Sequence, residues 1–303
     1  MCVFHTSKHP IVVPEGHKFP KNKYKMLFQK ARSEFAQRIQ LLDAPETTIQ
    51  DLCKAHKLTY VQKVLGGLLN AQEERELGFP WSESLAIRAR HSVGATIRAS
   101  LRAVEQDGIS INLGGGAHHA KSQQAAGFCI FNDVAVAALK VYLARRLGRV
   151  LIVDCDVHQG DGTAEILARY PSIYTFSIHA TRNYPRRKMT SDFDIGLPDG
   201  TSDQTYLSKL RWGLSEIFRQ FRPNFMIYIA GADVYKGDRL GRFTLSKQGI
   251  SDRDHTVLRL ASDREIPIAL VMGGGYATEV SDTIDIHLQT ISNALEYFDR
   301  YNE

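Results

Sequence analysis

Short apolar runs that alternate with amphipathic stretches constrain the fold of this chain more than any other feature. Five runs have the length and composition of strands buried on both faces of a sheet. These runs are Ile109–Leu113, Val150–Val153, Ile173–Ile178, Phe225–Ala230 and Ile268–Met272. Helical periodicity fills the intervals over Ser84–Glu105, Asp133–Arg146, Asp203–Phe221, Lys247–Asp263 and Thr278–Tyr297. The alternation predicts an α/β protein, a three-layer αβα domain with a central, mostly parallel sheet.

The remaining sequence is consistent with a single domain. In the first hundred residues the patterns are mostly helical, and we expect helices over Lys25–Leu42, Thr48–His56 and Tyr60–Leu69. No internal repeat, low-complexity tract or linker-like stretch divides the chain, so we predict one domain over residues 1–303. The hydrophobic fraction of 43% is sufficient for a full core.

Composition argues against several classes of protein. No apolar run approaches the roughly 18 residues that cross a bilayer, and the N-terminus lacks the pattern of a secretory signal. The four cysteines form no C-x-x-C pair, so we expect neither disulfides nor a thiolate zinc site, and we place the protein in the cytoplasm. The net charge of +5 comes without a motif for direct nucleic-acid binding. The sequence carries no signal for an oligomeric state.

Polar residues follow four of the predicted strands at the point where each strand ends. They are His118 and His119 after the first, Asp154, Asp156, His158 and Asp161 after the second, Asp233 after the fourth and Tyr276 after the fifth. The carboxyl ends of parallel strands share one edge of the sheet, where such folds bind ligands. We therefore expect these side chains to form one site.

Three of these residues have the chemistry of a catalytic metal site. Asp156, His158 and Asp233 offer two carboxylates and one imidazole and leave a coordination position open, which suits zinc; iron(II) or manganese would accept the same ligands. Such an ion activates water and polarises an amide carbonyl. Helix capping and turn formation are the simpler interpretation of single aspartates. That interpretation is weaker here because Asp154, Asp156 and Asp161 crowd one short segment and repel one another without a cation.

Two adjacent histidines and a tyrosine complete the predicted site. His118 and His119 follow a glycine run that permits a tight loop, although paired histidines in such a loop are also common at surfaces. Asp154 and Asp161 remain after the metal takes Asp156, and each is a natural hydrogen-bond partner for one ring. Tyr276 follows a triple glycine, and its hydroxyl is either packed or placed to donate to a carbonyl oxygen that gains negative charge.

These motifs resemble the zinc-dependent histone deacetylase family, which has the arginase/deacetylase fold. The matching segments occur in the family's order and are His118-His119, Gly127-Phe128-Cys129 with Asn132-Asp133, Asp154 to Gly162, Gly231-Ala232-Asp233 and Gly273 to Tyr276. The segment His17–Tyr24 resembles the N-terminal region of bacterial members. The nearest likeness is to the class IV deacetylases and their bacterial relatives, and it is carried by Gly114–Gly116, Gly237–Gly241 and Phe243–Ser246.

The resemblance implies a role for each residue of the site. Asp156, His158 and Asp233 would bind one zinc ion per chain. His119, oriented by Asp161, would be the general base, and His118, oriented by Asp154, would give electrostatic support. Tyr276 would polarise the scissile carbonyl.

The resemblance also implies a substrate channel and a second cation. Phe128, Tyr184 and Gly127 would line an apolar channel for the lysine methylenes. Backbone carbonyls would hold a monovalent cation such as K⁺, and they belong to Asp154, Asp156, His158, Ser177 and Ile178. Cys129 and Cys155 lie beside these segments, and we expect both to be small buried packing residues.

The function predicted from the sequence is a zinc-dependent amidohydrolase that removes acetyl or longer acyl groups from lysine side chains of proteins or peptides. A deacetylase of small acylated amines such as acetylpolyamines is an alternative, although the basic segment Arg186–Lys188 near the expected rim disfavours polycations. A non-catalytic acyl-lysine binder would be expected to lack part of the catalytic set, yet each position is filled. A two-manganese ureohydrolase would need further carboxylates beside Asp233.

Overall fold

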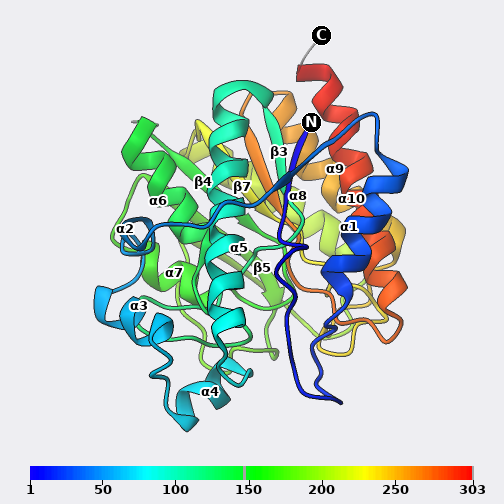
Figure 1. The fold of residues 1–303 in the computed structure, drawn as a ribbon. Coiled ribbons are helices and arrows are strands. Elements are labelled where there is room, and N and C mark those ends of the chain that lie inside the picture. The colour runs from blue at the N-terminus through cyan, green and yellow to red at the C-terminus, as the bar shows by residue number, and fades with distance from the viewer. Residues whose placement is uncertain (146–147, 302–303) are drawn as a thin grey trace.

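A parallel sheet organises the part of the chain that the computed structural model describes, residues 1–145 and 148–301 (Figure 1). Its eight described strands run in the order β2-β1-β3-β8-β7-β4-β5-β6, and each neighbouring pair is parallel. Their bounds are β1 (Cys2–His5), β2 (Gln40–Asp43), β3 (Ile109–Asn112), β4 (Val150–Asp154), β5 (Ile173–Ala180), β6 (Phe193–Leu197), β7 (Phe225–Ile229) and β8 (Ile268–Val271). The predicted α/β class is confirmed.

Helices cover both faces of the sheet, which gives the three layers (Figure 1). One layer contains α2 (Ile49–Leu52), α3 (Leu58–Leu65), α5 (Glu83–Arg102), α6 (Asp133–Arg145) and α7 (Asp161–Leu167). The other contains α1 (Lys23–Glu34), α8 (Asp203–Gln220), α9 (Lys247–Ser262) and α10 (Val280–Tyr301). Two further elements are α4 (Ala71–Leu77) and a π-helical turn, η1 (Ala103–Asp107), that extends α5.

The strands are buried on both faces because their alternate residues enter two different cores. In β4, Leu151 and Val153 pack against the layer of α8 to α10, whereas Val150 and Ile152 pack against the layer of α5 and α6. A strand of this kind needs apolar side chains at every position, which is why it reads as a continuous apolar run in the sequence. All five predicted strands are present for this reason, with bounds that agree to within two residues.

The structure corrects several predicted elements, mostly in the first hundred residues. The helix predicted over Lys25–Leu42 is wrong beyond Glu34, since residues 40–43 form strand β2. Strands β1 and β6 and helices α4 and α7 were not predicted. Strand β1 offers only three apolar residues, Cys2–Phe4, before His5, and β2 and β6 are partly exposed edge strands without a continuous apolar run, so none carries a strong periodic signal. The helix predicted over Asp133–Arg146 is present as α6, and its predicted last residue, 146, lies outside the described residues.

His56 ties the N-terminal helices to the loops beside the predicted site. Its ring is buried, Nε2 accepts a hydrogen bond from the backbone N–H of Asn132 at 2.9 Å, and Nδ1 lies 2.9 Å from the carbonyl oxygen of Lys121. Nε2 is an acceptor here, so the single ring proton belongs on Nδ1, where it donates to Lys121. Burial lowers the pKa of His56 to about 4, even though the carbonyl of Lys121 acts in the opposite direction.

Acidification should therefore destabilise the fold through His56. The pKa of His56 is lower in the folded state than its ordinary value of 6.5. The contribution of neutral His56 to the free energy of unfolding is therefore complete above pH 6.5 and is lost as the pH falls toward 4. The shift corresponds to up to about 3 kcal/mol of unfolding free energy. We expect His56→Gln to flatten the pH dependence of urea unfolding over this range. His91→Gln, at a partly exposed histidine, is the control, and equal flattening in both variants would contradict the assignment.

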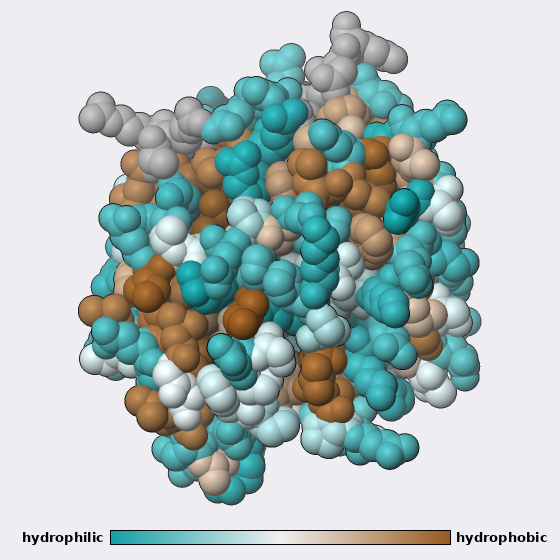
Figure 2. All heavy atoms as spheres, viewed as in Figure 1, coloured by the Kyte–Doolittle hydropathy of each residue, from teal (hydrophilic) through white to brown (hydrophobic). Residues whose placement is uncertain are grey.

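The hydropathy of the helices and of the surface bears on membrane-spanning segments and on large apolar patches. None of the described helices is both long enough and apolar enough to cross a membrane. On the face seen in Figure 2, apolar side chains gather in separate patches among hydrophilic ones.

Candidate active site

Four neighbouring strands deliver the predicted site residues to one edge of the sheet. In spatial order these strands are β3, β8, β7 and β4. The residues that follow them are His118 and His119 after β3, Tyr276 after β8, Asp233 after β7, and Asp156 and His158 after β4. Residues far apart in the sequence thus meet because their strands are adjacent and parallel.

The three predicted metal ligands converge in the structure. The ligand atoms of Asp156, His158 and Asp233 all lie within 4.8 Å of one another, and all three residues are buried. Nδ1 of His158 is 2.9 Å from Oδ1 of Asp156 and 3.3 Å from Oδ2 of Asp233. Oδ1 of Asp233 accepts a hydrogen bond from the backbone N–H of Val157 at 2.9 Å. Oδ2 of Asp233 is buried and accepts no well-aligned hydrogen bond from the described residues.

The charges of this triad fit a divalent cation. Burial and the charge of Asp156 raise the pKa of Asp233. Burial alone would lower the pKa of His158, but the hydrogen bond to Asp156 and the negative charges of Asp156 and Asp233 outweigh it and raise that pKa to about 10. The protein alone thus uses a proton to offset two buried carboxylates, and a divalent cation would replace it.

Glycines allow the segments around the triad to approach closely. Gly274 has a φ of +55°, and a Cβ atom there would lie 2.3 Å from Oδ2 of Asp233. A Cβ atom on Gly231 would lie 2.5 Å from Cα of Asp156. Any larger residue at either position would displace a ligand segment.

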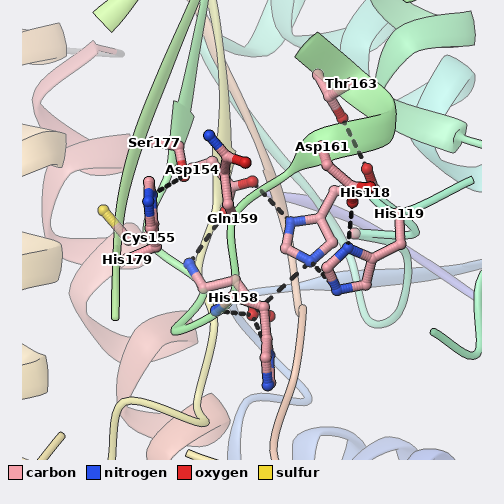
Figure 3. A network of polar contacts seen from close by, with 12 residues as sticks. His118, His119, Asp154, Cys155, His158, Gln159, Asp161, Thr163, Ser177 and His179 are labelled. Atoms are coloured by element: carbon pink, nitrogen blue, oxygen red, sulfur yellow. Dashed lines mark hydrogen bonds and ion pairs between the residues drawn. The ribbon is translucent and has the colours of Figure 1, made fainter. Parts of the chain in front are cut away.

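Each histidine of the pair has its own carboxylate partner (Figure 3). Nδ1 of His118 lies 2.7 Å from Oδ2 of Asp154, and Nδ1 of His119 lies 2.7 Å from Oδ1 of Asp161, the first residue of α7. The two Nε2 atoms face each other at 3.2 Å. Both predicted His–Asp contacts are therefore present, and all four side chains are buried.

The electrostatic environment separates the two rings. Burial disfavours a charge on His118, but Asp154 and Asp156 outweigh it and raise the pKa of His118 to about 9. Burial and the charge of His118 together lower the pKa of His119 to about 3, despite the hydrogen bond to Asp161. These directions favour a cationic His118, which donates from Nε2 to Nε2 of a neutral His119, so the lone pair of His119 faces a proton donor.

Three polar groups hold the loop of Tyr276. Oδ2 of Asp238 accepts a hydrogen bond from the backbone N–H of Tyr276 at 2.5 Å, and Nε of Arg239 donates to its carbonyl at 3.1 Å. The ammonium of Lys23, which is fully buried, donates to the carbonyl of Gly274 and lies 5.5 Å from the centre of the Tyr276 ring. Burial keeps the pKa of Tyr276 well above its usual value, so its hydroxyl remains protonated and able to donate.

A pocket of about 340 Å³ opens above the triad, and the predicted channel residues form its walls. The Tyr184 ring packs edge-on against His119 with centroids 4.7 Å apart, and the Phe128 ring lies 5.8 Å from that of Tyr276. Phe128 has a φ of +67°, a strained value for a bulky residue that is typical of functional segments. A Cβ atom on Gly127 would lie 2.6 Å from the His119 ring, so glycine is required there.

The residues predicted to hold a monovalent cation lie on β4, on the loop that follows it and on the neighbouring strand β5. Asp154 is directly opposite Ser177 in the sheet, but the Ser177 hydroxyl is 3.0 Å from Nδ1 of His179. The monovalent cation at the carbonyls of this region, including that of Ile178, stays a prediction. Cys129 and Cys155 are buried free thiols, as expected, and burial raises both pKa values.

Several residues that support the site were not predicted from the sequence. They are Lys23, Lys121, Gln159, Asp238 and Arg253. Lys121 lies 3.3 Å from Oδ2 of Asp161, and the amide of Gln159 donates to Asp194 and to the carbonyl of Met189. Lys23, Gln159 and Asp238 belong to segments that carried the resemblance to the family, and that resemblance is the only signal for them in the sequence.

The geometry describes a parallel α/β protein with a candidate metal centre at the carboxyl edge of its sheet. The histone deacetylase domain matches residues 17–291. The chain is 36% identical to an uncharacterized protein of Picosynechococcus sp. over 91% of this chain and 92% of that protein. It is also 36% identical to histone deacetylase 2 of Arabidopsis thaliana and 37% identical to histone deacetylase clr6 of Schizosaccharomyces pombe.

The chain belongs to the histone deacetylase family. The matches to the Arabidopsis and fission-yeast proteins cover 65% and 64% of this chain but 52% and 48% of those proteins, so the chain spans about half their length. The narrower likeness to class IV deacetylases stays a prediction.

Proposed function

We propose that the protein is a zinc-dependent amidohydrolase that removes acetyl or longer acyl groups from lysine side chains of proteins or peptides. The observation that carries the proposal is the convergence of Asp156, His158 and Asp233 beside His119, at the base of a pocket with aromatic walls. Two carboxylates and an imidazole with an open position form a donor set typical of catalytic zinc. A cation held there would supply Lewis-acid chemistry, which acidifies water and polarises a carbonyl group.

The protein's own groups divide the remaining tasks. Nε2 of His119 accepts a proton from the attacking water and later returns it to the leaving amine. His118, held cationic by Asp154, offsets negative charge that develops nearby. The hydroxyl of Tyr276 donates a hydrogen bond to the scissile carbonyl oxygen. Phe128 and Tyr184 exclude water from the aliphatic part of a lysine side chain.

The mouth of the pocket favours acylated lysine over polyamine substrates. Two exposed cations, Lys18 and Arg75, line the pocket, with Glu76 as the single exposed acid among its lining residues. Such a mouth repels a polycation. The basic segment Arg186–Lys188 was expected to repel polycations at the rim. Its Lys188 instead donates to the carbonyls of Asn183 and Pro185 and so stabilises the Tyr184 loop. We further propose a cytoplasmic location.

An assay of one lysine peptide that bears acetyl, octanoyl or myristoyl groups tests the function, with metal analysis of the same preparation. We expect release of the free lysine and the carboxylate from at least one peptide, in proportion to bound zinc. An acetylated polyamine serves as the comparison. If the metal-loaded protein hydrolyses the polyamine and none of the peptides, the small-amine alternative is correct; if it hydrolyses neither, the proposal fails.

The pairing of His119 with Asp161 predicts a shift in the pH profile of this reaction. Asp161→Asn keeps the shape of the side chain but removes the negative charge that stabilises a protonated His119. The pKa of His119 should therefore fall further, so the protonated His119 that forms during proton transfer becomes less stable, kcat/KM should drop, and any acidic limb that His119 sets should move to lower pH. Asp154→Asn, which acts through His118, should lower the rate with less displacement of this limb. A shift seen only in Asp154→Asn would mean that the roles of the two histidines are reversed.

A further inference from the structure

Arg253 is a fully buried arginine whose side chain reaches the ends of two strands. It lies on α9, none of its surface is exposed, and it is among the largest completely buried side chains of the described residues. An isolated buried charge is costly, and a guanidinium is retained in such a place only where its donors are paired. The identity of its acceptors is therefore informative.

One nitrogen of Arg253 bonds to both segments that carry metal ligands. Nη1 donates to the carbonyl oxygen of Gly231 at 2.5 Å and to that of Cys155 at 3.3 Å. Gly231 precedes Asp233 by two residues, and Cys155 directly precedes Asp156. The guanidinium thus links the end of β7 to the end of β4 directly behind the triad.

The other side of the guanidinium is fixed by Asp254. Nε and Nη2 of Arg253 donate to Oδ1 of Asp254 at 3.0 and 2.8 Å. Asp254 is itself held by the hydroxyl of Tyr228 at 2.5 Å and by that of Thr290 at 2.6 Å. The planar fork of an arginine can serve acceptors on both sides at once, which the single ammonium of a lysine cannot reproduce.

We propose that Arg253 is a positioning residue for the metal centre, which holds the segments of Asp156 and Asp233 at the separation that the ion requires. The inference rests on the metal-ligand assignment of the proposed function. Two features of the site make such a link effective. The triad spans two separate strand ends, and the buried carboxylates of Asp156 and Asp233 repel each other, so a cation behind their backbones opposes separation of the two segments.

The Co²⁺ affinity of purified, metal-free protein tests this role. The probe is Co²⁺ alone, measured by competition with a chelator and by its visible absorption bands, which report ligand geometry. We expect Arg253→Lys to weaken Co²⁺ binding by about 10- to 100-fold, the usual effect of losing a group that orients ligands, and to alter the bands. Asp254→Asn, which loosens the guanidinium without removing it, should weaken binding less, and it decides the question if Arg253→Lys does not fold.

Arg88→Lys is the matched control. Arg88 is also buried and also donates to backbone carbonyls, those of Thr6 and His9, but it bonds to neither ligand segment. We expect it to lower the thermal stability of the metal-free protein while leaving Co²⁺ affinity and spectrum unchanged. Equal affinities in wild type, Arg253→Lys and Asp254→Asn would overturn the inference and leave the metal site intact. Failure of the wild type to bind Co²⁺ or Zn²⁺ would instead overturn the proposed function.

Discussion

Asp233→Ala should abolish metal binding and amide hydrolysis together. Asp233 supplies the one carboxylate oxygen of the triad that is buried without a well-aligned hydrogen bond, so a cation is the partner that it lacks. Without the Asp233 carboxylate, only His158 and Asp156 remain as ligands, both from one segment. Catalytic zinc sites use three protein ligands. Metal content by elemental analysis and turnover of an acyl-lysine peptide should both fall to background.

A second substitution at this position separates metal loss from unfolding. Alanine leaves the buried N–H of Val157 without its acceptor, which costs roughly 1–3 kcal/mol. Asp233→Asn keeps that acceptor and removes the charge. Burial and Asp156 raise the pKa of Asp233, so its charge destabilises the metal-free fold, and Asp233→Asn should be at least as stable as metal-free wild type.

The exposed Asp199, paired with Arg242 at the surface, gives the control Asp199→Ala, which should bind metal normally. Full metal content in both Asp233 variants would rule out Asp233 as a ligand.

The strands that end at the candidate site could be predicted from the sequence. Strands β4 and β7 are buried on both faces, so burial forces apolar side chains at each position and makes the strands visible as runs. The polar residues that follow such runs must then meet at the carboxyl edge of a parallel sheet. The site could be predicted because its residues are tied to these strand ends.

The supporting residues could not be predicted from patterns in the sequence. Arg253 and Lys23 lie on α9 and α1, where a charged residue ordinarily indicates a solvent-facing position. Both side chains are nevertheless fully buried and donate to backbone carbonyls of loops distant in sequence. A backbone carbonyl has no sequence signature, so pairings of this kind become visible only when the strands are placed in space.

Tyr276→Phe should lower kcat by on the order of 100- to 1,000-fold, the usual cost of removing one donor to a developing oxyanion. The ring of Tyr276 packs against Phe19 and Phe128 and lies beside the ammonium of Lys23, and phenylalanine keeps all of these contacts. The variant should therefore fold and bind metal like the wild type.

His119→Ala should lower kcat at least as much as Tyr276→Phe, with metal retained, because the proposed task of His119 is proton transfer rather than ligation.

Tyr184 provides the matched control for the Tyr276 hydroxyl. It lines the same pocket as Tyr276, but it contacts the site through its ring, which lies 4.7 Å from the ring of His119 and 6.4 Å from that of His158. Tyr184→Phe keeps that ring, so turnover should change little, whereas Tyr184→Ala should raise KM through loss of a channel wall. A hydroxyl that acts only on the transition state lowers kcat without raising KM. Near-normal kcat in metal-loaded Tyr276→Phe, or equal losses in both Tyr→Phe variants, would show that the Tyr276 hydroxyl does not stabilise the transition state.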